Sequence, residues 1–390
     1  MKISKPKNDV YLIAAASLLL TIGLIMVFSA SAFVAHERHG SLLFFFRKQI
    51  FWGFLCVLSI FIFSRLKFSY DPKPGLPLLI VLISVIFLVG LFFIGDVVNG
   101  ARRWYNLGIG SFQPSEFAKF ALIFYFAHIF AHKSDLLYDW RKGLLPHLFV
   151  LGMVLLPVYL QPDLGTVLMT LMIIGIMAFM SNVRFKHVLA GAFFLLPLLI
   201  IKVRSSSYQF KRIGDWWANL NNPLGSGYQI KQSLIGFGRG GLFGNGLGTS
   251  KQKFYFLPDS HTDFVFAITG EEIGFIGTTL ILLLFLVILW RGISIAKRAQ
   301  NPFAQFLAIG LTMNLVLYAF MNAAVTTMLV PTTGLPMPFI SYGGTSLLFT
   351  GIAIGLLINI ARRSENTSVQ NLRTQGSRSR DISGTFIMSE

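Results

Sequence analysis

Acidic side chains interrupt the apolar stretch SHTDFVFAITGEE, which begins at Ser260. Ionisable groups at the edge or in the interior of a membrane helix are costly, so each is expected to have a function or a specific partner. Asp263 could accept the proton of a substrate hydroxyl as a general base. Alternatively, Thr262 caps the helix that starts here, and Asp263 interacts with the positive end of its dipole.

Glu271 and Glu272 lie two helical turns beyond Asp263. At roughly 1.5 Å of rise per residue they are about 12 Å further along, too far to share a small reaction centre with Asp263. We predict that both are structural and bind neighbouring helices or Lys119. A proton relay in a transporter is the alternative for such intramembrane carboxylates.

A second group of polar residues lies in NGARRWYNLGIGSFQPSEFAKF, which begins at Asn99. The guanidinium groups of Arg102 and Arg103 beside the Trp104 indole suit a diphosphate or an anionic lipid, whereas interface anchoring by Trp104 alone is the alternative. Glu116 and Lys119 are spaced i,i+3 at the start of an apolar helix, which predicts a helix cap and an internal ion pair.

Two further segments have compositions unsuited to regular helices. Glycines recur from Gly236 to Gly248 around Arg239, and their N–H groups could bind phosphate, with tight turns as the alternative. This stretch lacks a strand–loop–helix nucleotide motif and a GK[ST] ending, so we expect no nucleotide. The segment PTTGLPMPFISYGGTSLL, from Pro331, is predicted to line an outer pocket, because broken backbone at membrane depth must be buried or line a cavity. Asp163 in QPDLGT is expected to cap a helix.

The elements that must position these residues are membrane helices. Of 390 residues, 54% are hydrophobic and 13% are charged, and apolar runs recur that are long enough to cross about 30 Å of hydrocarbon. We predict an all-α polytopic membrane protein with about ten transmembrane helices, at residues 10–33, 49–64, 76–95, 115–132, 146–160, 166–180, 188–203, 264–290, 304–323 and 341–360. The net charge of +17 is dispersed between apolar segments, which favours topology signals and anionic lipids over nucleic acid.

The distribution of Lys and Arg predicts the orientation. Basic residues are concentrated in the short segments that share a side with the N-terminus, so both termini are expected in the cytoplasm. Residues 1–363 then form the membrane domain, with one large extracytoplasmic loop at about 204–262 between the seventh and eighth helices. The tail from Ser364 to Glu390 is expected to be disordered. The first apolar segment is longer than a signal-peptide core, so we expect it to be retained. The single cysteine excludes an intrachain disulfide.

Three long motifs in order, GARRW…QPSEFAK, GYQIKQSLIGFGRGGLFGNGLGTSKQKFYFLPDSHTDFVFAITGEEIG and LPMPFISYGGTSLL, resemble the SEDS family (shape, elongation, division and sporulation proteins). The resemblance covers nearly the whole chain, and GNGLGTSKQK is more similar to division members than to elongation members. The segment PTTGLPMPF also resembles elongation members, so an elongation or sporulation member is the alternative. Asp259 replaces the glutamate usual in the family.

The resemblance implies a peptidoglycan glycosyltransferase in the bacterial inner membrane, at the division septum. Family members polymerise lipid II, a disaccharide-pentapeptide on undecaprenyl diphosphate, together with a class B penicillin-binding protein and other division proteins. The essential acidic residue of the family falls on Asp263, and its first outer motif falls on Arg103 and Trp104.

The predicted site therefore has Asp263 as catalytic base. The predicted substrate and diphosphate contacts are Arg102, Arg103, Trp104, Arg239, Lys251, His261, Ser341 and Tyr342. A divalent cation such as Mg²⁺ could assist, although no ligand cluster is evident and the metal site stays undefined. A lipid II flippase and a non-catalytic scaffold for the crosslinking enzyme are the alternatives.

Overall fold

The computed structural model describes residues 9–67, 70, 72–73, 75–98, 100–108, 110–133, 136–181, 183–221, 227–253 and 261–384. Each of the ten segments expected to span the membrane is helical. They are α1 (Val10–His39), α2 (Phe44–Arg65), α3 (Gly75–Ile94), α4 (Pro114–His132), α5 (Leu145–Leu160), α6 (Leu164–Phe179), α7 (Phe185–Ser205), α10 (Val265–Arg298), α11 (Pro302–Thr326) and α12 (Gly344–Gly384). The polytopic helical class is thereby confirmed.

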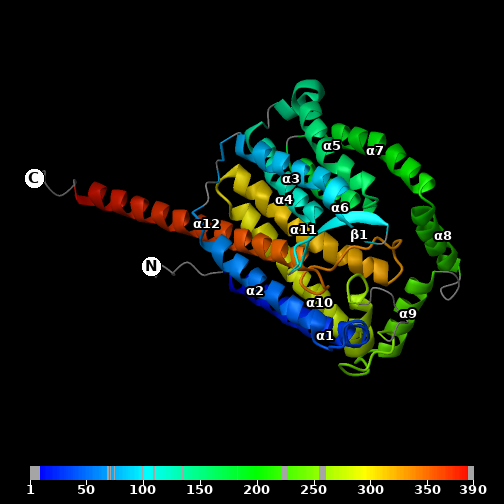
Figure 1. Ribbon diagram of the computed structural model, residues 1–390. Coiled ribbons are helices and arrows are strands. Elements are labelled where there is room, and N and C mark those ends of the chain that lie inside the picture. The colour runs from blue at the N-terminus through cyan, green and yellow to red at the C-terminus, as the bar shows by residue number, and fades with distance from the viewer. Residues whose placement is uncertain are drawn as a thin grey trace, which may run out of the picture.

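Six helices among the described residues are long and apolar enough to cross a membrane: α1, α2, α3, α10, α11 and the Gly344–Ser364 part of α12. The shorter apolar helices α5 and α6 lie among them. The count of ten spans, the membrane orientation and the disorder of the tail remain predictions. The start of α1 lies beside Ser364 of α12 in a shared surface hollow, so both lie at the same end of the bundle (Figure 1).

The opposite end of the bundle contains the non-helical elements and the long connection (Figure 1). A three-stranded antiparallel sheet is formed by β1 (Asp96–Val98), β2 (Ala101–Asn106) and β3 (Ser111–Phe112), with β2 in the centre. The connection after α7 forms two helices, α8 (Ser207–Asn221) and α9 (Tyr228–Gly240). A short 3₁₀ turn (Leu136–Tyr138) and a π-helical turn (Trp140–Leu144) precede α5.

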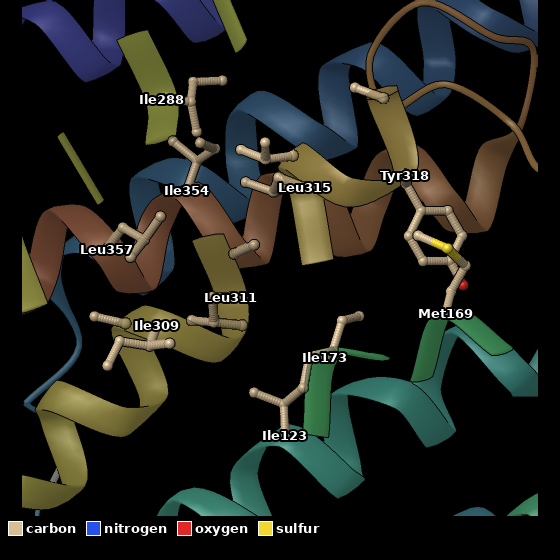
Figure 2. Close-up of a cluster of buried hydrophobic side chains, with 14 of the residues drawn as sticks. Ile123, Met169, Ile173, Ile288, Ile309, Leu311, Leu315, Tyr318, Ile354 and Leu357 are labelled. Atoms are coloured by element: carbon tan, nitrogen blue, oxygen red, sulfur yellow. The ribbon is translucent and has the colours of Figure 1, made fainter. Parts of the chain in front are cut away.

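Helix α11 occupies the centre of the bundle, where it packs against α4, α6, α10 and α12. Figure 2 shows Leu315 of α11 beside Ile354 of α12. Gly310 of α11 allows a close approach to α4, because a Cβ added there would lie 2.6 Å from a side-chain atom of Ile123, and small residues are usual at contacts between membrane helices. α11 is therefore a rigid element from which polar side chains can be presented to the site.

Cys56 lies in the contact between α2 and α12 and is fully buried. A Cβ added at Gly351 of α12 would lie 2.6 Å from the Cys56 carbonyl oxygen and 2.9 Å from its Sγ. The two helices thus touch through a glycine and a small thiol, which leaves no space for a larger side chain at either position.

Helix α10 is broken near its start. Gly274 has φ 71° and ψ −169°, so Val265–Ile273 form a separate helical segment before the long apolar part. These angles lie outside the region that side-chain-bearing residues adopt, and glycine is required there. The break separates the first segment, which follows Asp263, from the long apolar part of the helix.

Candidate active site

A cavity of about 500 Å³ opens at the end of the bundle that contains the sheet. The walls come from β2, the turn before α6 and the start of α6, the end of α7, helix α8, the residue before α10, and the end of α11 with the segment that follows it. The lining residues are Ala101, Arg103, Trp104, Pro162, Asp163, Leu164, Gly165, Leu168, Val203, Gln209, Arg212, Ile213, Asp263, Met321, Val330, Pro331, Thr332, Thr333 and Gly334. The prediction that the proline- and glycine-rich segment walls a pocket is confirmed for residues 331–334.

Asp263 lies on the cavity wall immediately before α10. The amide of Asn322 on α11 donates to the main-chain oxygen of Asp263 at 2.8 Å. Across the cavity wall, a Cβ added at Gly334 would lie 3.4 Å from Asp263 Oδ2 and 3.8 Å from Arg212 Nη1. The carboxylate and a guanidinium group therefore meet at the same glycine.

Arg103 and Trp104 reach the cavity from β2. The Arg103 Nε donates to the oxygen of Gln161 at 3.0 Å, and its Nη2 donates to the oxygen of Pro162 at 2.6 Å. On the same strand the Tyr105 hydroxyl donates to Phe87 O at 2.8 Å, and desolvation raises its pKa. β2 is thereby tied both to α3 and to the turn before α6, with a cationic side chain facing the cavity.

Asp163 contributes a second carboxylate to the cavity wall. Its Oδ1 accepts from the Thr166 amide at 3.2 Å and its Oδ2 accepts from the Thr166 hydroxyl at 3.0 Å. This is the N-cap of α6 that the sequence favoured. Both oxygens of Asp163 are engaged by the helix start.

Arg212 is a cavity residue that the sequence analysis missed. It lies on α8, and its Nη1 donates to Thr332 O at 3.2 Å. One turn later the Trp216 indole donates to Met328 O at 2.9 Å, so α8 is bound along one face to the segment after α11. The amphipathic pattern of residues 207–221 could have indicated this helix, but the partner of Arg212 arises only from the tertiary fold.

Six of the predicted contact residues do not line the cavity. Arg102 donates to Phe92 O, and the Arg239 guanidinium lies 3.7 Å from Glu271. The Lys251 amide donates to Glu271 Oε1. The remaining three, His261, Ser341 and Tyr342, lie in two segments of the chain that pack against each other. The His261 ring contacts the Tyr342 ring, the Tyr342 amide donates to His261 O, and the Ser341 hydroxyl accepts from the Met337 amide.

The sequence of the chain matches a known protein family. The model of the FtsW, RodA and SpoVE proteins, described as "Cell cycle protein", matches residues 9–366. The chain belongs to this family. The resemblance inferred from the motifs is therefore confirmed, since the matched range contains all three of them.

Relatives in this family cover almost the whole chain. Stage V sporulation protein E of Bacillus subtilis is 40% identical over 364 residues, which are 93% of this chain and 100% of that protein. The probable peptidoglycan glycosyltransferase FtsW of Geobacter sulfurreducens is 38% identical over 357 residues, 92% of this chain and 96% of that protein.

Solved structures of the family have the same fold. A chain from a peptidoglycan synthase complex that coordinates polymerisation and crosslinking superposes with a TM-score of 0.73 at 25% identity, covering 92% of this chain and 98% of that one. RodA of Thermus thermophilus superposes with a TM-score of 0.65 at 26% identity, covering 91% and 97%.

Four other charged residues that the sequence analysis identified are buried and bound by neighbouring residues. They are Glu116, Lys119, Glu271 and Glu272. Lys119 Nζ lies 2.8 Å from Glu116 Oε1 and 3.7 Å from the centre of the Tyr318 ring. Glu272 accepts from the Ser29 hydroxyl at 2.7 Å. Because each carboxylate is bound by neighbours of its own, the contacts suit the structural role predicted for them, although Lys119 binds Glu116 rather than Glu271 or Glu272.

Glu271 and Glu272 fix the stretch that follows the glycine run. The Glu271 carboxylate accepts from the Ser250 hydroxyl at 2.5 Å and from the main-chain amide of Gln252 at 3.2 Å. Glu272 Oε1 lies 3.3 Å from Lys253 Nζ. Carboxylates that accept several backbone and side-chain donors of one loop hold that loop in a single conformation.

The glycine run itself packs against the break in α10. The main-chain amides of Asn245 and Gly246 donate to the main-chain oxygens of Glu271 and Glu272. In return, the main-chain amides of Phe275 and Ile276 donate to the main-chain oxygens of Gly241 and Leu242. Gly244 lies so close to Glu272 that a side chain would overlap its carbonyl group. The amides at 245 and 246 are therefore bound to protein, which favours close packing over phosphate binding for these glycines.

Proposed function

We propose that this protein is a peptidoglycan glycosyltransferase that polymerises lipid II at the outer face of the cytoplasmic membrane. Relatives that match over nearly its full length include proteins named probable peptidoglycan glycosyltransferase FtsW. The observation that carries the proposal is the cavity, which collects the Asp263 carboxylate, the guanidinium groups of Arg103 and Arg212, and the Trp104 indole.

The chemistry requires these groups. An acceptor sugar hydroxyl attacks the anomeric carbon of the donor, and the bond from that carbon to the diphosphate oxygen breaks. Asp263 accepts the hydroxyl proton as general base. The electron pair of the broken bond leaves on undecaprenyl diphosphate, whose charge Arg103 and Arg212 stabilise. A direct displacement of this kind needs one base, and Asp163 is already engaged as the cap of α6.

A divalent cation remains part of the proposal as an aid to diphosphate departure. Among the described residues no three His, Cys, Asp or Glu side chains form a metal-binding group. Two carboxylates do line the cavity, those of Asp163 and Asp263. They would offer oxygen ligands of the kind that Mg²⁺ prefers, with the substrate diphosphate completing the set. No nucleotide is proposed.

The proposed partner is a class B penicillin-binding protein that crosslinks the new strands. Its support is the structural similarity to a chain of a peptidoglycan synthase complex in which polymerisation and crosslinking are coordinated. We propose the division septum as the location, because several relatives are named FtsW. A fluorescent fusion that collects along the side wall instead of midcell would favour an elongation role.

The test is polymerisation of labelled lipid II by the purified protein with its cognate penicillin-binding protein, with transpeptidation blocked. Wild type is expected to give a ladder of glycan strands, and Asp263→Asn to give none while still binding the partner. Asp215→Asn, on α8 but not among the residues that line the cavity, is the matched loss of a carboxylate and is expected to retain the ladder. A ladder from Asp263→Asn would refute the assignment of the base. No ladder from partner-bound wild type would favour a flippase or scaffold.

A further inference from the structure

We propose that Asn322 is a positioning residue of the transfer reaction, which holds the Asp263 carboxylate in place through the main chain. The inference rests on the proposed function and adds to it a residue outside the cavity lining. Asn322 Nδ2 donates to Asp263 O and to Leu335 O, both at 2.8 Å. One side-chain amide thereby joins the two segments that carry Asp263 and Gly334 onto the cavity wall.

The position of Asn322 makes this link rigid. Its side chain is 2% exposed and projects from α11, the central helix of the bundle. A primary amide has two N–H donors, and here each is used on the carbonyl of a different segment. Removing the amide would leave two buried carbonyl groups without these donors, a loss that such groups tolerate poorly.

A second main-chain bond anchors the segment that carries Asp263. The Tyr342 amide donates to His261 O at 2.9 Å, and the His261 ring packs against the rings of Phe45 and Tyr342. His261 is therefore fixed two residues before Asp263, and Asn322 fixes Asp263 itself. Asn322→Leu removes the bond at Asp263 itself and leaves the bond at His261.

The expected consequence is a loss of rate with little loss of binding. Asn322 does not line the cavity, so it contributes no direct contact to a substrate there. A displacement of about 1 Å between a catalytic group and its target can reduce a rate by as much as about 100-fold. We expect Asn322→Leu to reduce kcat by about 10- to 100-fold and to change KM by less than about twofold.

The experiment compares Asn322→Leu with Asn314→Leu in the lipid II polymerisation assay, using the full chain with its partner. Asn314 is on the same helix, is 6% exposed, and receives the same change. Thermal unfolding is measured for both. If Asn322→Leu does not fold, Asn322→Ser replaces it with Asn314→Ser as its control, because a hydroxyl is a single donor and cannot bind both carbonyl groups at once. Asn314→Leu is expected to keep its kcat.

A double-mutant cycle with Asp263→Glu, which keeps a carboxylate and moves it by one methylene, decides whether Asn322 acts through Asp263. If it does, Asn322→Leu reduces the rate of Asp263→Glu by a smaller factor than it reduces the wild-type rate. An equal fold-loss in both backgrounds, or an effect no larger than that of Asn314→Leu, would overturn the proposal. These outcomes differ from failure of the proposed function, in which wild type gives no ladder or Asp263→Asn retains full activity.

Discussion

Three glycines with positive φ differ in what a methyl group at each position would meet. Gly40, Gly334 and Gly274 have φ values of 65°, 73° and 71°. Gly40, with ψ 9°, is in the left-handed region, where an alanine costs about 1–2 kcal/mol. Gly274, with ψ −169°, is in a region essentially restricted to glycine, where a side chain costs about 1–3 kcal/mol. These backbone costs are of the same order, so the larger difference between the changes comes from the contacts of the new methyl group.

The surroundings of the three positions are unlike. At Gly40 the space is open, with nothing within 4 Å of an added Cβ. At Gly334 the methyl group would lie 3.4 Å from Asp263 Oδ2, an ordinary contact that fills the space beside the carboxylate. At Gly274 it would overlap the Gly244 nitrogen and lie 2.6 Å from Leu242 O. Main-chain atoms cannot move aside as a flexible side chain can.

The expected magnitudes follow from these contacts. Four hydrogen bonds join residues 241–246 to α10, and each is worth about 1 kcal/mol. Gly274→Ala breaks this docking, so its cost is roughly 5–7 kcal/mol when the backbone cost is added. That is comparable with the whole stability of a domain, about 5–15 kcal/mol. Gly40→Ala and Gly334→Ala should each lose only the backbone contribution.

The assay pairs thermal unfolding in nanodiscs with lipid II polymerisation. Gly40→Ala and Gly334→Ala are expected to unfold at similar temperatures, a few degrees below wild type. Of these two, Gly334→Ala is expected to lose polymerisation activity and Gly40→Ala to keep it. Gly274→Ala is expected to be unfolded or severely destabilised. If Gly274→Ala unfolded within a degree of Gly40→Ala, the docking of the glycine run on α10 would be wrong. Full polymerisation by Gly334→Ala would show that the acceptor does not use the space beside Asp263.

Two further predictions concern charged side chains that are bound within the protein. Arg103→Lys keeps the charge but loses the forked contact with Gln161 O and Pro162 O, so we expect a loss of polymerisation rate of about tenfold or more; an unchanged rate in lipid II kinetics would show that the fork is dispensable. Lys119→Met leaves the Glu116 carboxylate buried without its cation and should reduce the free energy of unfolding by about 3–5 kcal/mol. The double change with Glu116→Gln should recover most of that loss, and thermal unfolding that shows no recovery would contradict the pairing.

The helices were predictable from the sequence to within a few residues, apart from the longer α1, α10 and α12. Their apolar runs are long, and hydrophobicity alone identifies such segments. α8 and α9 were not predicted as helices, because their apolar residues cover only one face and are mixed with charges. Their boundaries depend on what they pack against, which a single sequence does not show.

The candidate site was predictable where motifs carry it. Asp263, Arg103 and Trp104 were identified from the sequence and all line the cavity. Arg212 was missed because its partner, Thr332 O, lies 120 residues away. Arg239 was expected near the diphosphate, but a buried carboxylate on α10 lies beside it. Long-range partners of this kind arise only once the chain has folded.

The buried thiol of Cys56 has a practical consequence for spectroscopy. It is the only cysteine in the chain and is fully enclosed between α2 and α12, so water-soluble maleimides should not reach it in the folded protein. It also need not be removed, which spares the tight contact with Gly351. A cysteine introduced at exposed Trp217 of α8 could thus be labelled selectively in otherwise native protein, and its movement followed while substrate enters and product leaves.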